Sequence, residues 1–76
     1  MKYYFLQIGQ RLLLWRFDDG VVEKLANDGR TWIRAPSAAS HISGMGDGDA
    51  DEITKEQARN VYRRLFPEGD PDEAIP

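Results

Sequence analysis

The sequence contains no cysteine, a single histidine and no long hydrophobic run. Without cysteine, neither disulfides nor thiolate ligands can supplement the core, and one histidine does not favour a structural zinc site. No stretch approaches the roughly 20 apolar residues that cross a bilayer, and the N-terminal apolar segment lacks a small-residue cleavage site. We therefore expect a cytoplasmic protein with no signal peptide, no cofactor and no membrane contact.

The chain is short, at 76 residues. A domain of this size buries only about 60% of the surface that its unfolded chain exposes, so its stability is marginal. Aromatic residues make up 11% of the sequence, which argues against intrinsic disorder. The core must therefore be completed by tight packing, by self-association or by a bound partner.

Turn signals divide the first half of the chain. Asp19-Gly20 and Asp28-Gly29 are typical of two-residue type I′ turns, and Gly9-Gln10 is typical of a type II′ turn. The apolar and β-branched runs between these turns predict four antiparallel strands, at residues 2–8, 11–17, 21–26 and 30–35.

A helix is predicted after residue 53. Thr54 and Gln57 have the spacing of a capping box, and Pro67 ends the helix near Phe66. An apolar stripe at helical spacing follows the cap: Ala58, Val61, Tyr62 and Leu65. The fold class is therefore α+β, a four-stranded antiparallel β-meander with one C-terminal α-helix packed on one face.

Two segments have no apolar periodicity. Residues 36–51 are rich in small and acidic residues and predict a long flexible loop within a single domain over residues 1–66. Residues 67–76 predict a disordered acidic tail.

Two-residue turns also fix the strand register, because side chains alternate between the two faces of a sheet. One face, called the Trp15 face, holds Leu6, Leu13, Trp15, Phe17, Val22 and Ile33. The other, called the Trp32 face, holds Tyr3, Phe5, Leu14, Leu25 and Trp32, with Arg16, Glu23 and Arg34 at its edge. Glu23 falls between Arg16 and Arg34, which supports this register, since opposite charges across strands are favourable.

One helix covers one face of such a sheet, and we assign it to the more apolar Trp15 face. The Trp32 face is then left exposed, and its aromatic and arginine content is typical of protein interfaces. Two alternatives stay open. The loop 36–51 folds back over this face, or the sheet curls into a small barrel with a two-sided core.

Few residues suggest chemistry. Asp47, Asp49 and Asp51 begin like a calcium loop, but the positions for its glycine and its bidentate glutamate hold Glu52 and Ala58. They remain a weak divalent-cation candidate. His41 has serine neighbours but no rigid scaffold to orient a nucleophile, and we expect no enzyme.

A basic stripe on the helix, formed by Lys55, Arg59, Arg63 and Arg64, suggests contact with nucleic acid together with the sheet aromatics. Residues 46–76 nevertheless carry nine acidic against four basic residues, and phosphate repels acidic segments. Nucleic-acid binding is therefore the alternative. The leading prediction is a small non-enzymatic protein-interaction module (an adaptor, inhibitor or regulatory subunit) that binds a protein partner or itself, as a homodimer, through the Trp32 face.

Overall fold

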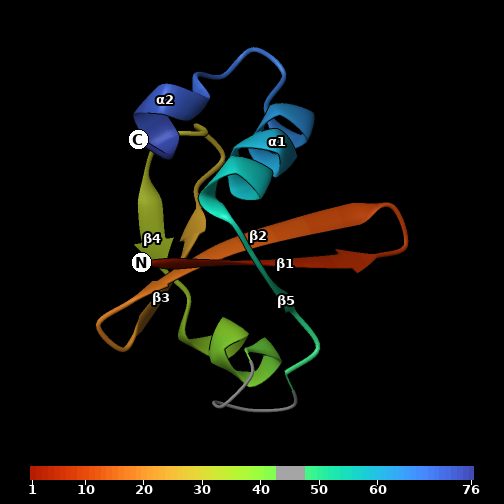
Figure 1. The fold of residues 1–76 in the computed structure, drawn as a ribbon, viewed down its shortest axis with the longest axis vertical. Helices are drawn as coiled ribbons and strands as arrows, with labels where there is room; N and C mark the ends of the chain where they lie inside the picture. The colour runs from red at the N-terminus through yellow and green to blue at the C-terminus, as the bar shows by residue number, and fades with distance from the viewer. Residues whose placement is uncertain (43–47) are drawn as a thin grey trace.

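The computed structural model describes residues 1–42 and 48–76. It is an α+β fold in which a five-stranded antiparallel sheet lies between two helices on one side and a 3₁₀ helix on the other (Figure 1). The sheet order is β4-β3-β2-β1-β5. The elements are β1 (Lys2–Ile8), β2 (Arg11–Asp18), β3 (Val21–Leu25), β4 (Trp32–Arg34), η1 (Pro36–His41), β5 (Asp51–Ile53), α1 (Lys55–Leu65) and α2 (Pro71–Ala74).

The predicted register is confirmed along the first four strands. Tyr3 lies opposite Arg16, and Leu25 lies opposite Trp32, as in the predicted register. Glu23 faces Arg16 and Arg34 in the register and forms an ion pair of 2.7 Å with Arg16. These pairings show that two-residue periodicity and turn length were sufficient to align the meander.

The prediction of two type I′ turns is correct for one of them. Asp19 and Gly20 both have positive φ, at 51° and 78°, as a type I′ turn requires. In the second turn only Gly29 has positive φ, and its N–H bonds to the carbonyl of Ala26. The β3–β4 connection is therefore a four-residue loop, residues 27–30, closed by the bond from Ala26 N–H to Thr31 O.

The four-strand prediction misses one strand. Residues Asp51–Ile53 form β5, which pairs antiparallel with Tyr3–Phe5 of β1. Thr54 alone separates β5 from α1, and its hydroxyl accepts from Gln57 N–H while the Gln57 side chain accepts from Thr54 N–H. The predicted capping box is thus confirmed.

The helix covers the face opposite to the one we assigned. α1 packs on the Trp32 face, where Ala58 and Tyr62 are buried against Tyr3 and Leu14. The Trp15 face is covered instead by residues 35–42 and by Ala50, and Ala38, Ile42 and Ala50 are buried there. The assignment was wrong because small alanines spread over an irregular segment give no periodic signal, although together they bury one face of the sheet.

The C-terminal residues also differ from the predicted disordered tail. Pro71–Ala74 form α2, with the Asp70 side chain accepting from Asp72 N–H at its N-terminus. Ala74 and Ile75 are buried in the same core as Tyr62. Figure 1 shows α2 beside α1 on one side of the sheet. Within the described residues, no helix is both long enough and apolar enough to cross a membrane.

Candidate binding cleft

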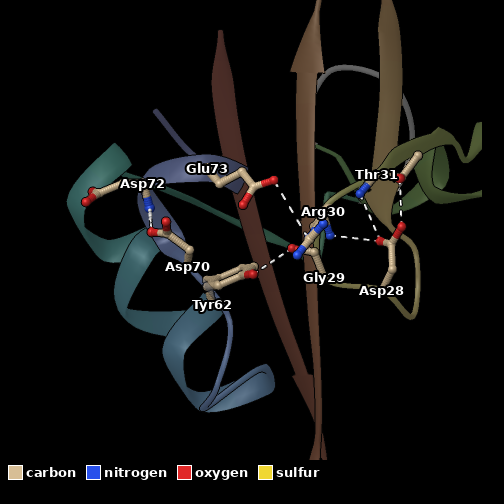
Figure 2. A network of polar contacts seen from close by, with 8 residues as sticks. All are labelled: Asp28, Gly29, Arg30, Thr31, Tyr62, Asp70, Asp72 and Glu73. Carbon is tan, nitrogen blue, oxygen red and sulfur yellow. Dashed lines mark hydrogen bonds and ion pairs between the residues drawn. The ribbon is translucent and has the colours of Figure 1, made fainter.

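A cleft of about 590 Å³ lies where the β3–β4 loop meets the end of α1 and the start of α2. Tyr62 and Leu65 belong to α1, while Arg30 belongs to the loop and Glu73 to α2. Figure 2 shows the polar contacts that join these three elements. Because the three elements come from different parts of the chain, the cleft exists only in the folded domain.

Tyr62 holds the floor of the cleft in place. Its side chain is 1% exposed, and its hydroxyl donates a 2.6 Å hydrogen bond to the carbonyl of Gly29 (Figure 2). Burial raises the pKa of the Tyr62 hydroxyl, and the nearby Asp70 and Glu73 carboxylates raise it further. Tyr62 is therefore a neutral hydrogen-bond donor that ties α1 to the β3–β4 loop.

Two glycines permit the close approach of these elements. A Cβ added at Gly29 would lie 3.0 Å from the Phe66 ring, and Gly29 also has a φ of +70°, which side chains rarely adopt. At Gly69, a Cβ would overlap the Tyr62 hydroxyl. The backbones at Gly29 and Gly69 therefore pack directly on the aromatic side chains at the C-terminal end of α1.

Asp28 fixes the conformation of the loop on the opposite wall. Its carboxylate accepts hydrogen bonds from Arg30 N–H at 2.8 Å, from Thr31 N–H at 2.9 Å and from the Thr31 hydroxyl at 2.8 Å (Figure 2). These bonds favour the ionised form and lower the pKa of Asp28 from its usual 3.8 to about 2. The loop therefore keeps an anionic side chain among the residues that line the cleft.

Three further contacts attach α2. The indole N–H of Trp32 donates to the carbonyl of Ala74 at 2.9 Å, and Asp72 forms an ion pair with Arg59 of α1. Arg30 approaches Glu73 at 3.7 Å, but both side chains are largely exposed, so this pair contributes little. The contacts place the acidic first turn of α2 along one side of the cleft.

The lining combines apolar walls with an excess of negative charge. Four carboxylates line it against one guanidinium: Asp28, Glu68, Asp70 and Glu73 against Arg30. The rings of Tyr62 and Phe66, together with Leu65 and Pro67, supply its apolar surface. A lining of this kind complements a ligand that carries both positive charge and aliphatic surface.

The residues predicted to bind a partner lie elsewhere in the structure. Tyr3 and Leu14 are buried under α1, and Leu25 and Trp32 pack against the same cluster. Phe5 is half-buried on this face. The helices therefore occupy the surface that sequence reasoning left open for a partner.

Two of the three charged residues at the edge of that face, Arg16 and Glu23, have internal partners. Besides its ion pair with Glu23, the Arg16 guanidinium lies 4.5 Å above the Trp32 ring, within the range of a cation–π contact. Arg34 is exposed on β4. Arg16 and Glu23 thus stabilise the sheet beside α2.

The predicted cation site is only partly described. Asp47 lies outside the described residues. The Asp49 carboxylate accepts a 2.8 Å hydrogen bond from His41 Nδ1, and Asp51 lies in β5. Within the described ranges no group of three or more His, Cys, Asp or Glu side chains is placed to hold a metal ion.

His41 has a neighbour that sequence reasoning did not anticipate. Its ring stacks on Trp15 with centroids 5.4 Å apart and an interplanar angle of 4°. The contact attaches the end of η1 to the Trp15 face. No sequence pattern links these two residues, which lie 26 positions apart.

The basic stripe on α1 is partly neutralised within the chain. Arg59 is paired with Asp72, and Arg63 donates to the Asn60 side chain at 2.7 Å. The stripe is therefore in contact with the acidic C-terminal segment at Arg59.

The cleft itself was missed because its acidic wall lies in the segment that composition marked as disordered. The available signals were Asp70-Pro71, which resembles a helix start, and the apolar pair Ala74-Ile75. Comparison with known proteins adds no relative: no family model, no curated protein and no solved structure matches the chain. The chain is thus defined by its architecture, an α+β domain whose sheet is covered on both faces and which carries an acidic cleft.

Proposed function

We propose that this protein is a non-enzymatic protein-interaction module whose cleft binds a positively charged segment of a partner protein. The observation that carries the proposal is the lining of the cleft, which combines four carboxylates and one guanidinium with apolar and aromatic side chains. A lysine or arginine side chain suits this arrangement, because its aliphatic stem packs on apolar surface while its charged end meets the carboxylates.

The construction of the cleft supports the same function. Tyr62, Gly29 and the Asp28 cap hold its walls in one geometry before any partner arrives. A preformed site loses less conformational entropy on binding than a site that must first be ordered. Electrostatic attraction also accelerates encounter with a basic segment and weakens as salt is added.

The test is a pair of short labelled peptides, one alternating lysine with leucine and the other alternating glutamate with leucine. We expect the lysine peptide to bind, with an affinity that falls as salt is raised, and the glutamate peptide not to bind. Fluorescence anisotropy measures the affinity. In an NMR titration, the amide signals of Gly29 and Gly69 should shift.

Variants locate the binding. Glu68→Gln with Glu73→Gln removes two charges from the cleft, and we expect affinity to fall by about 2- to 30-fold, since exposed ion pairs are worth ~0.2–1 kcal/mol each. Asp51→Asn with Glu56→Gln removes two charges outside the cleft and should change affinity much less. Equal losses in the two variants, or binding of both peptides, would contradict the proposal.

A further inference from the structure

A second groove, of about 260 Å³, adjoins the cleft, and we call it the β2-edge groove. It lies beside the first residues of β2, which precede Trp15, where the pairing of β2 with β3 begins. Asn27 of the β3–β4 loop and Leu65 and Phe66 at the end of α1 form its other walls. Half-buried leucines give it an apolar surface: Leu12, Leu13 and Leu25.

The cleft and the β2-edge groove form one continuous surface. Leu65 and Phe66 line both of them. Asn27 and Asp28 are consecutive in the β3–β4 loop, and the first lines the groove while the second lines the cleft. A bound segment that leaves the cleft over Leu65 and Phe66 therefore enters the groove.

The charge of the lining changes sign between the two sites. Four carboxylates and one guanidinium line the cleft. The groove is lined by two cations, Arg11 and Lys24, and its described lining contains no acidic residue. Both cations are exposed, and within the described ranges neither forms an ion pair. Their charges are therefore available to a ligand.

The two cations are too far apart to share one carboxylate easily. Lys24 faces Trp15, which is four positions along β2 from Arg11. At ~3.3 Å per residue this separation is about 13 Å. An extended segment that runs along β2 would meet both cations with acidic side chains spread over about four residues.

We propose that the partner segment is bipolar, with a basic part in the cleft and an acidic part in the β2-edge groove against Arg11 and Lys24. Aliphatic side chains between the two parts pack on Leu65 and Phe66. This inference rests on the proposed function, which assigns the basic part, and it adds the acidic part and the order of the charges along the surface.

The arrangement also discriminates among basic segments. A uniformly basic segment that fills both sites brings its second half against Arg11 and Lys24, and this repulsion weakens its binding. A bipolar segment in the reversed direction places like charges together in both sites. The groove thus selects one class of partner and fixes the direction in which it lies.

Three labelled peptides of equal length test the charge order. Each has one half that alternates lysine with leucine, and the other half alternates leucine with glutamate, glutamine or lysine. We expect the glutamate (bipolar) peptide to bind about 2- to 30-fold more tightly than the glutamine peptide, because it adds two exposed ion pairs. Fluorescence anisotropy measures both affinities.

Overall charge alone predicts the opposite order. The chain has a net charge of −3, so the more positive glutamine peptide would bind more tightly than the bipolar peptide if only total charge mattered. An advantage of the bipolar peptide therefore reports local contacts with the groove.

Variants place the acidic half of the peptide. Arg11→Gln with Lys24→Gln should remove the advantage of the bipolar peptide and leave the affinity for the glutamine peptide almost unchanged. Lys2→Gln with Lys55→Gln is the matched control, because it removes two exposed cations that line neither site. The control should keep the advantage.

Charge reversal gives a readout that a merely structural role would not produce. Arg11→Glu with Lys24→Glu should reverse the preference, so that the uniformly basic peptide binds more tightly than the bipolar peptide. An unchanged order of affinities in this variant would contradict the proposal.

The failure of this inference is distinguishable from the failure of the proposed function. If the glutamine peptide binds and the bipolar peptide binds no more tightly, the acidic part is overturned and the basic cleft stands. An advantage that persists in Arg11→Gln with Lys24→Gln also overturns the inference. If neither peptide binds, or if Glu68→Gln with Glu73→Gln weakens neither, both proposals are overturned.

Discussion

The two Asp-Gly pairs show how one dipeptide serves two different turns. Asp19 itself adopts a positive φ and completes a type I′ turn with Gly20. Asp28 leaves the left-handed conformation to Gly29 and uses its carboxylate to bind Arg30 and Thr31. The register survives this difference, because the four-residue loop joins the same strand positions, Ala26 and Thr31, as the predicted two-residue turn.

The Asp28 carboxylate makes stability depend on pH. Its pKa is about 2 in the fold against the usual 3.8, so the unfolded chain binds more protons between these values and stability rises with pH through that window. The contribution is complete above about pH 5 and is lost as the pH falls toward 2.

We therefore expect Asp28→Asn to be less stable than the parent chain at pH 6, with a gap that narrows as the pH is lowered from 5 to 2. Thermal unfolding followed by circular dichroism at a series of pH values measures this gap. A gap of constant size across the series would mean that the charge of Asp28 contributes nothing to the loop.

Among the elements, those with regular periodicity could be predicted from the sequence, and those held by irregular packing could not. The strand pairs followed from turn length, and the capping box located the start of α1 within one residue. β5 is only three residues long, and η1 buries a single alanine, Ala38, without a repeating apolar pattern. Such segments are stabilised by the surface that they cover, so their own sequences carry little information about their structure.

The element most unlike its prediction is α2, which packs as part of the core. Ile75 is 0% exposed and adjoins Tyr62 and Ala74 in the buried cluster. We expect Ile75→Ala to cost about 2–5 kcal/mol of unfolding free energy, as for other buried isoleucines. Urea denaturation measures the loss.

Ile33→Ala is the comparison for that experiment. It removes the same atoms from a side chain that is 41% exposed on β4, and surface substitutions usually change stability by less than about 0.5 kcal/mol. Similar small losses in both variants would show that the C-terminal segment is detached from the domain in solution.

Across the whole molecule, the sheet is shared by two separate cores. Tyr3 and Tyr4 are neighbours in β1, yet Tyr3 is buried beneath the helices and Tyr4 beneath residues 35–42 and Ala50. The sequence showed that both faces of the sheet are apolar. It did not show which segment packs on which face, because that depends on the path of the chain in space. Because β1 belongs to both cores, neither core can form fully without the other.

We therefore expect the domain to unfold in one cooperative step. Trp15→Phe leaves only Trp32, which reports on the helical side, and Trp32→Phe leaves only Trp15, which reports on the other side. In each variant the fluorescence transition should coincide with the transition in far-ultraviolet circular dichroism. Separate midpoints for the two probes within one variant would show that the cores unfold independently.

The hydrogen bond from Trp32 to Ala74 has an optical consequence. Ala74 follows Glu73, which lines the cleft, so a bound segment that displaces α2 would alter the polarity around the indole. Trp15 lies on the far side of the sheet, stacked on His41, and serves as an internal reference. If a segment binds the cleft as we propose, we therefore expect the fluorescence of Trp32 in the native chain to change without an added label.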